Sequence, residues 1–168
     1  MPLSLYEVSI PVFIRTFGHF SKFLDKGRAF ADEKGIPHSA LLEARLYPDM
    51  APLTAQVQRA SDTARFAPIR VAQVEAVSMP DTETSFEELQ ARIAKTVDFL
   101  KTVPPHAIDA GEETEVTLKT QLFSMTFTGK DYLLGFAMPN FYFHVTTAYG
   151  ILRHQGVPLG KLDFFGRG

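Results

Sequence analysis

The chain contains no cysteine and no tryptophan. The absence of cysteine excludes disulfides, thiolate metal ligands and a cysteine nucleophile, and with them the zinc-finger and thioredoxin classes. An excess of charge of one sign is also missing, because 17 basic and 19 acidic residues leave a formal net charge of -2 and no run of Lys or Arg. We therefore expect no binding to nucleic acid and none to an anionic membrane.

Long hydrophobic runs are missing as well. No window approaches the roughly 20 apolar residues of a membrane span, and residues 1–7 lack the basic head and apolar stretch of a signal peptide. A cytoplasmic protein is therefore expected. The chain has 168 residues, of which 45% are hydrophobic, and this is enough to bury one core without disulfides. We predict a single domain over 1–168.

Four segments show the alternating three- and four-residue spacing of apolar side chains that is typical of bundle helices. The first runs over 10–31, is rich in phenylalanine and stops at 35–37, with Ser9 as a candidate cap. The second covers 46–64, with prolines in its first turns, and Pro68 marks its end.

The third and fourth helices have the clearer ends. The third, over 86–100, begins where Ser85 and Glu88 have capping-box spacing. The fourth is entered at Pro139 and closed by Gly156. Two long loops are predicted, over 68–84 and 103–114.

Between the third and fourth helices the pattern changes to strict alternation. Residues 115–120 and 122–128 are rich in β-branched and aromatic side chains, which predicts a short β-hairpin or extended excursion. A lone pair of strands is marginally stable, so Phe123 and Phe127 are expected to pack on the bundle. The final segment, 159–166, is too apolar for a free tail and is expected to dock on the bundle or on a second subunit.

The most informative residue is His144, a polar side chain within the apolar seam of the fourth helix. It lies between Phe141 and Ala148 in that seam, and Asn140 lies one turn earlier on nearly the same face. Burying an imidazole and an amide costs a few kcal/mol unless each finds a partner. The helix therefore requires either a polar network or a ligand inside the bundle.

Two interpretations of His144 stay open. It is a ligand or general base in a pocket, or it is a core histidine that is hydrogen-bonded to Asn140, Gln56 or a buried water. Asn140 and Gln56 in turn either complete that pocket or only satisfy local backbone groups. Two secondary candidates, Asp49 and Asp62, flank the second helix and could orient the His144 ring, although Asp62 is otherwise expected at the surface. Two more, Tyr149 and Arg153, lie one turn apart and could hold an anionic ligand.

The phrase His144-x7-Leu152-Arg153-x2-Gly156 is similar to the last helix of the DinB/YfiT-like superfamily of four-helix bundles. The longer stretch from Pro139 to Phe164 resembles an uncharacterised family inside that superfamily, and the first two helices fit it as well. The resemblance implies an all-α bundle with an up-down-down-up order of helices. Such an order needs a long crossing connection.

The resemblance also bears on metal binding. In metal-binding relatives three histidines hold a divalent ion, one from the second helix and two, four residues apart, from the fourth. Here His144 matches the second of that pair, whereas the first falls on Asn140 and the second-helix ligand falls near Gln56. One imidazole and two amide oxygens bind Zn or Ni poorly. We therefore expect no cofactor, or at most a weakly bound divalent metal.

Three functions can be weighed from these residues. The leading hypothesis is a homodimeric DinB-like bundle with a degenerate metal site, whose His144 pocket either binds a small molecule or is a relic of that site. The alternative, which the resemblance implies, is a divalent-metal-dependent transferase that moves a low-molecular-weight thiol, or a related hydrolase. DNA binding by a helix-turn-helix is disfavoured, because no helix carries a basic recognition face.

Overall fold

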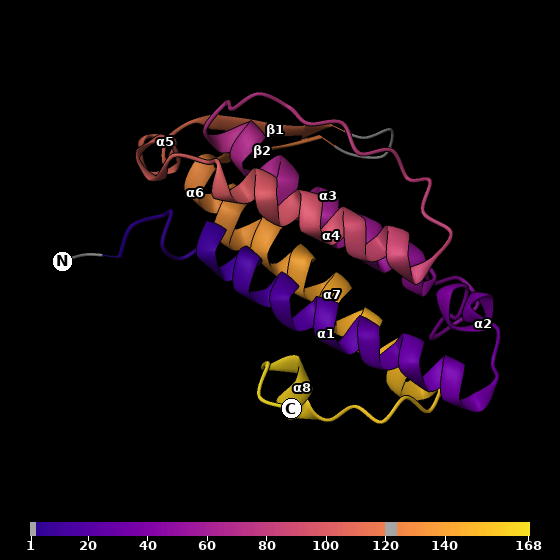
Figure 1. Cartoon of the computed structure of the whole chain (residues 1–168). Coiled ribbons are helices and arrows are strands. Elements are labelled where there is room, and N and C mark those ends of the chain that lie inside the picture. The colour runs from indigo at the N-terminus through magenta and orange to yellow at the C-terminus, as the bar shows by residue number, and fades with distance from the viewer. Residues whose placement is uncertain (1–2, 120–123) are drawn as a thin grey trace.

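Four long helices form the protein in the computed structural model, which describes residues 3–119 and 124–168 (Figure 1). The helices α1 and α7 run in one direction and α3 and α4 in the other, so that the order is up-down-down-up. The predicted all-α bundle with this order is confirmed. The long helices are α1 (Ile10–Lys34), α3 (Leu53–Val71), α4 (Phe86–Lys101) and α7 (Met138–His154).

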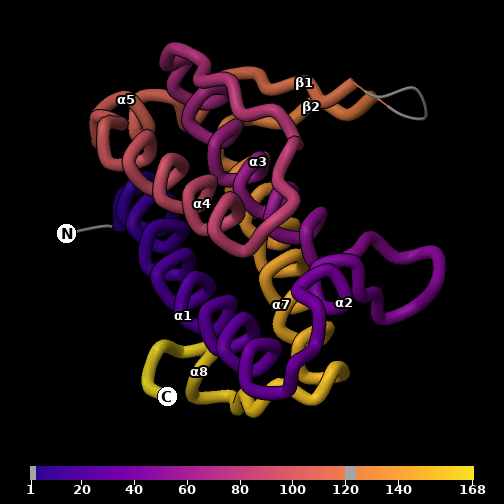
Figure 2. Tube along the Cα trace, turned by 45° about the vertical axis from the view of Figure 1, so that its right-hand side comes forward, coloured from indigo at the N-terminus to yellow at the C-terminus, as the bar shows by residue number. Residues whose placement is uncertain are grey.

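The neighbours α3 and α4 run in parallel, and this requires a connection that returns along the bundle. Residues 72–85 provide it and pass over the outside of both helices (Figure 2). The prediction of a long crossing connection is therefore confirmed. No helix among the described residues combines the length and the hydrophobicity that a membrane crossing requires.

Helix α1 ends where the sequence predicts. Gly35 adopts a left-handed conformation with φ of 64°, and its N–H donates toward the carbonyl of Ala31. The start differs in one detail, because the Ser9 hydroxyl donates to the carbonyl of Leu5 (2.7 Å) and does not cap the helix. Phenylalanines of α1 fill the core and include Phe13 and Phe17, whose rings meet the ring of Phe141 edge to face.

The predicted bounds of the second helix were wrong at both ends. Residues 43–52 form a loop after the short helix α2 (His38–Leu42), and α3 begins at Leu53 with Pro52 as its N-cap. Pro68 lies inside α3 and does not end it. Its missing N–H removes one hydrogen bond, but the next turn still closes because Ala72 N–H donates to the Pro68 carbonyl (2.9 Å).

Helix α4 has the predicted cap, since the Ser85 hydroxyl oxygen accepts from Glu88 N–H (3.1 Å). The Glu88 carboxylate, however, accepts from the N–H of Thr84 (2.6 Å) and not from that of Ser85. The predicted loop over 103–114 contains a short helix, α5 (Pro105–Ala110), which has proline in its first turn.

The predicted hairpin is present. Strands β1 (Glu115–Lys119) and β2 (Ser124–Thr128) pair in antiparallel register with Glu115 opposite Thr128. The Phe127 ring lies 6.2 Å from the ring of Tyr132 and 5.9 Å from that of Phe136, so this part of the hairpin packs on the bundle as expected. Phe123, which was expected to do the same, lies outside the described residues.

The last helix begins earlier than Pro139. The helical run starts as α6 (Gly129–Asp131), passes through a π-helical segment, η1 (Tyr132–Ala137), and continues as α7. Pro139 has no N–H to donate to the preceding turn, and a widened turn just before it avoids the clash that proline causes in a regular α-helix. At the other end Gly156 has the left-handed φ of 92°, as the sequence predicts for a closing glycine.

The apolar tail docks on the same chain. Helix α8 (Lys161–Phe164) contacts α1, where Asp163 forms an ion pair with Lys26. The Phe164 ring meets the ring of Tyr149 edge to face at 6.0 Å. The segment was expected to dock either on the bundle or on a second subunit, and the structure shows that it docks on the bundle.

Candidate functional site

A cavity of about 270 Å³ lies between α3, η1 and α7 and contains the predicted His144. Its walls combine cationic, aromatic and hydrogen-bonding side chains, which is the mixture that small-molecule sites usually present. A π-helical turn forms one wall, and such turns are frequent at functional sites. The lining residues are Arg59, Asp62, Thr63, Phe66 and Arg70 from α3, Tyr132 and Phe136 from η1, and Asn140 and His144 from α7.

The His144 ring is held by Gln56. The Nδ1 atom lies 2.7 Å from Gln56 Oε1, and Gln56 Nε2 donates to the carbonyl of Ala51 (2.9 Å). The second bond fixes the amide so that its oxygen faces the ring, and Nδ1 must therefore carry the proton. The neutral ring then has its lone pair on Nε2. Of the three partners considered for a core histidine at this position, the structure shows Gln56.

Asn140 reaches the same cavity through a different partner. Its Nδ2 donates to the Thr63 hydroxyl (2.7 Å), and that hydroxyl donates to the carbonyl of Arg59 (2.7 Å). Asn140 is therefore positioned by α3 and not by a bond to His144. The structure places Asn140 and His144 together in the cavity wall, while Gln56 supports His144 from outside that wall.

Burial keeps the imidazole neutral. His144 is only 7% exposed, and burial, with a smaller contribution from the positive charge of Arg59, lowers the pKa of its ring to about 4. The ring is uncharged at neutral pH. Its Nε2 can therefore accept a hydrogen bond or a proton but does not supply a positive charge.

The aromatic wall holds a second arginine in place. Arg70 Nη1 donates to the Tyr132 hydroxyl (2.8 Å), and the guanidinium lies over the Phe66 ring, 4.7 Å from its centroid. Burial raises the pKa of Tyr132, so its hydroxyl stays protonated at neutral pH. This wall was not predicted from the sequence. The sequence does contain a pattern that could have indicated it, a second row of side chains on one face of α3 with three- and four-residue spacing. The row consists of Gln56, Arg59, Thr63, Phe66 and Arg70.

The structure does not bring the remaining candidates into the cavity, with one exception. Asp49 is exposed in the loop before α3. The Tyr149 ring packs against Phe23 and Phe164, and Arg153 donates to the carbonyl of Val157 (2.8 Å). The exception is Asp62, which was expected at the surface but is half-buried, lines the cavity and pairs with Arg65 and Arg92.

The donor set does not fit a catalytic Zn or Ni site. Over residues 3–119 and 124–168, no group of three or more His, Cys, Asp or Glu side chains could hold a metal ion. The amide oxygen of Gln56 is bonded to Nδ1 of His144, and Asn140 donates to Thr63 through its nitrogen, so these three side chains offer an ion only Nε2 of His144 and the amide oxygen of Asn140. A tetrahedral site would need three such donors to face one point.

Comparisons with known proteins give the family. The sequence model of a protein family described as a domain of unknown function, DUF1993, matches residues 5–165. The chain belongs to the DUF1993 family. A solved structure of a DinB family member protein from Shewanella denitrificans is similar to this DUF1993 chain, with 35% identity, a TM-score of 0.88 and coverage of 98% of this chain and 92% of that one. No curated protein matches it. The predicted resemblance is confirmed.

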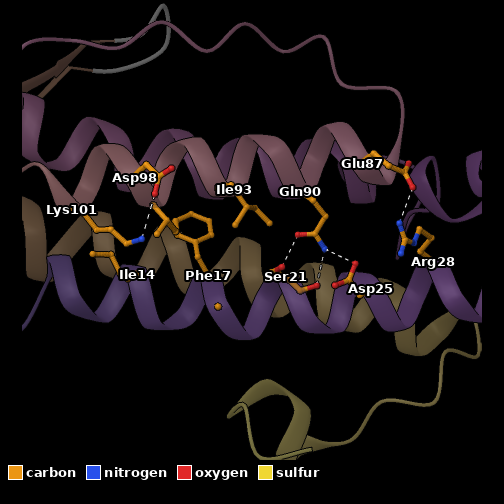
Figure 3. Close-up of a pocket in the computed structure, with 13 residues that line it drawn as sticks. Ile14, Phe17, Ser21, Asp25, Arg28, Glu87, Gln90, Ile93, Asp98 and Lys101 are labelled. Carbon is orange, nitrogen blue, oxygen red and sulfur yellow. Dashed lines mark hydrogen bonds and ion pairs between the residues drawn. The ribbon is translucent and has the colours of Figure 1, made fainter.

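The DUF1993 chain also has a wider groove, of about 810 Å³, between α1 and α4 (Figure 3). Its polar side chains bond across it to one another. Ser21 donates to Gln90 (2.6 Å), Gln90 donates to Asp25 (3.0 Å), and Arg28 pairs with Glu87 (2.9 Å). These bonds join the two helices. The smaller cavity, which has an acceptor nitrogen and two arginines, is the better candidate site.

The low pKa of His144 predicts a pH-dependent stability of the DUF1993 protein. The unfolded chain takes up a proton on this histidine below about pH 6.5, whereas the folded ring resists until about pH 4. As the pH is lowered from about 6.5 to about 4, the free energy of unfolding should therefore decrease, and this ring should account for roughly 2 kcal/mol of the decrease. Urea unfolding of the wild type and of His144→Gln at several pH values measures the difference.

The control for this measurement is His154→Gln, which removes an exposed histidine at the end of the same helix. The wild type and the control should lose stability in parallel, and His144→Gln should lose less. Three parallel curves would show that the His144 ring is protonated with its ordinary pKa in the folded protein, and would contradict the prediction.

Proposed function

We propose that this DUF1993 protein is a DinB-like bundle whose His144 cavity binds a small molecule without a catalytic metal. The observation that carries the proposal is the neutral imidazole, whose Nδ1 is held by Gln56 and whose Nε2 is left as an acceptor. Thr63 and Asn140 add polar groups beside it, and Phe66 and Phe136 add apolar surface. This combination suits a ligand with a hydroxyl or amide donor and a flat apolar part.

The cavity is, on this proposal, a degenerate metal site. Gln56 and Asn140 stand where the superfamily resemblance implies histidine ligands, and both polar atoms of the Gln56 amide are already bonded within the protein. An ion at Nε2 of His144 would find one imidazole and one amide oxygen and not the three imidazoles of the metal-binding relatives. We therefore infer that the cavity has only weak affinity for a divalent metal.

The proposal is tested by a fragment screen with thermal-shift detection. Fragments that enter the cavity should stabilise the wild type and a His154→Ala control, and should lose most of that effect in His144→Ala. A ligand at one hundred times its Kd adds about 2.7 kcal/mol to the free energy of unfolding, which is easily detected. Equal stabilisation of all three proteins by every hit would contradict a binding site at His144.

The alternative, a divalent-metal-dependent thiol transferase or hydrolase, makes a separate prediction. Protein purified without chelator or affinity tag should then contain about one Zn or Ni per chain, and the His144→Ala variant should lose it. Elemental analysis of both proteins distinguishes the two functions. Metal at that stoichiometry in the wild type alone would overturn the metal-free proposal.

We also propose that the protein is a homodimer. The support is the apolar surface left on the docked tail, where Leu162 and Phe165 are 59% and 53% exposed. Sedimentation velocity at micromolar concentration tests it, and a single monomeric species would contradict it.

A further inference from the structure

The charges around the His144 cavity are unbalanced. Two arginines line it, Arg59 and Arg70, and neither forms an ion pair with a carboxylate among residues 3–119 and 124–168. The single carboxylate in the wall belongs to Asp62, and its Oδ1 already pairs with Arg65 and Arg92 at 2.9 Å each. The cavity therefore has two cations without a matching anion.

Arg70 is held ready to bind. Its Nη1 is fixed by the Tyr132 hydroxyl at 2.8 Å, and the guanidinium lies over the aromatic faces of Phe66 and Tyr132. A guanidinium has five N–H donors, and this contact uses one of them. Since the side chain is already restrained, binding an anion there costs little conformational entropy.

Arg59 supplies the second positive charge, and it lies on the same face of α3 as Arg70, about three turns earlier. Its side chain is exposed, and its positive charge contributes to the lowered pKa of His144. The charge therefore acts across the cavity at the imidazole. An anion bound near Arg59 and Arg70 would lie next to a neutral acceptor, and the carboxylate in the wall, that of Asp62, is already paired with Arg65 and Arg92.

We propose, building on the function proposed above, that the ligand is a small planar carboxylate that also carries a hydroxyl or amide donor. The carboxylate binds Arg70, because guanidinium groups match carboxylates in charge and geometry, and Arg59 adds a second positive charge to the cavity. The donor group binds Nε2 of His144, and the flat part lies against Phe66 and Phe136. A volume of about 270 Å³ admits one substituted ring of this kind.

The test uses two acids, 3-hydroxybenzoate and 4-hydroxybenzoate, and the two matching hydroxybenzamides, which have the same shape without the charge. Calorimetry gives the affinities, and the NMR signals of the His144 ring report where each probe binds. At least one acid should bind at least tenfold more tightly than its amide, because a hydrogen bond to a charged group contributes more than one to a neutral group.

Charge-removing variants locate the effect. Arg59→Gln and Arg70→Gln should each weaken binding of the acid by roughly tenfold and leave the amide unchanged. The control is Arg15→Gln, which removes an exposed arginine from α1 and should alter neither affinity. Circular dichroism of each variant verifies that the helices remain.

The outcomes separate the ligand class from the cavity itself. Equal binding of acids and amides at His144, or weakening by Arg15→Gln as large as by Arg59→Gln, would overturn the anionic class and leave the small-molecule site in place. Failure of both acids, while neutral fragments from the screen still bind at His144, would have the same meaning. Failure of every probe and every fragment to perturb His144 would overturn the site and the ligand class together.

Discussion

Replacing Arg92 with methionine is expected to lower the free energy of unfolding by about 3–5 kcal/mol, because it removes one partner from a buried charge network. The Arg92 side chain is only 2% exposed. Its guanidinium lies 2.9 Å from Asp62, 2.9 Å from Asp81 and 3.0 Å from Glu83. Methionine fills much of the same space but leaves these carboxylates close together without their shared cation.

The loss should depend on pH through Glu83. Burial by itself would raise the pKa of Glu83, but hydrogen bonds from Gln58 and Arg92 outweigh it and hold the pKa below its ordinary value. Without Arg92 two of the contributions that lower this pKa are lost, and Glu83 should take up a proton more easily. The difference in stability between the wild type and Arg92→Met should therefore shrink as the pH is lowered.

Urea unfolding at neutral pH and at about pH 4, below the ordinary pKa of a glutamate, measures both effects. Arg15→Met is the matched control, since it makes the same substitution at an exposed position of α1 and should change the stability by less than about 0.5 kcal/mol. A loss below about 1 kcal/mol for Arg92→Met would show that the network does not stabilise the crossing connection.

Replacing Gly129 with alanine is expected to cost about 3 kcal/mol, at the upper end of the usual range for overfilling a closely packed site. A Cβ on Gly129 would lie under 3.0 Å from the carbonyl oxygen of Gly111, and one on Gly111 would lie under 3.0 Å from that of Val71. Backbone from both ends of the hairpin therefore meets the last turn of α3. A main-chain contact of this kind cannot be relieved by rotating a side chain.

Gly18→Ala is the matched control for this prediction. Gly18 lies inside α1, lines the groove of Figure 3, and has no atom within 4 Å of an added Cβ. Alanine there should stabilise the protein by up to about 1 kcal/mol, because it favours the helix over the unfolded chain. Thermal and urea unfolding should thus give opposite signs for the two variants, and equal signs would contradict the assigned contacts.

Much of the fold could be predicted because local rules agree with the final contacts. The capping box at Ser85 and the closing glycines at positions 35 and 156 mark ends that the structure keeps. The start of α3 could not be predicted in this way. Leu46 continues the helical spacing, but it lies in a loop where its side chain approaches Gly150 of α7. Its hydrophobicity serves a tertiary contact and not a helix.

The site was only partly visible in the sequence. His144 stands out because a histidine interrupts an apolar seam, and a contact with Gln56 was among the partners considered. Arg59 and Arg70 did not stand out, since arginines on a helix usually face solvent. Their role depends on Tyr132 and Phe136, which reach the cavity through a π-helical turn that has no recognised sequence signature.

That turn sets the angular position of the hairpin around the axis of the last helix. Each residue of an α-helix advances the direction of its side chain by about 100°, so a π-helical turn holds one residue more than regular winding allows. Deleting Gly135, which has open space beside it, would restore regular winding and rotate everything before it. Phe127 and Tyr132 would then rotate together away from Phe136, and the cavity would lose the wall that these rings form. The extra residue thus couples the orientation of the strands to the shape of the binding site.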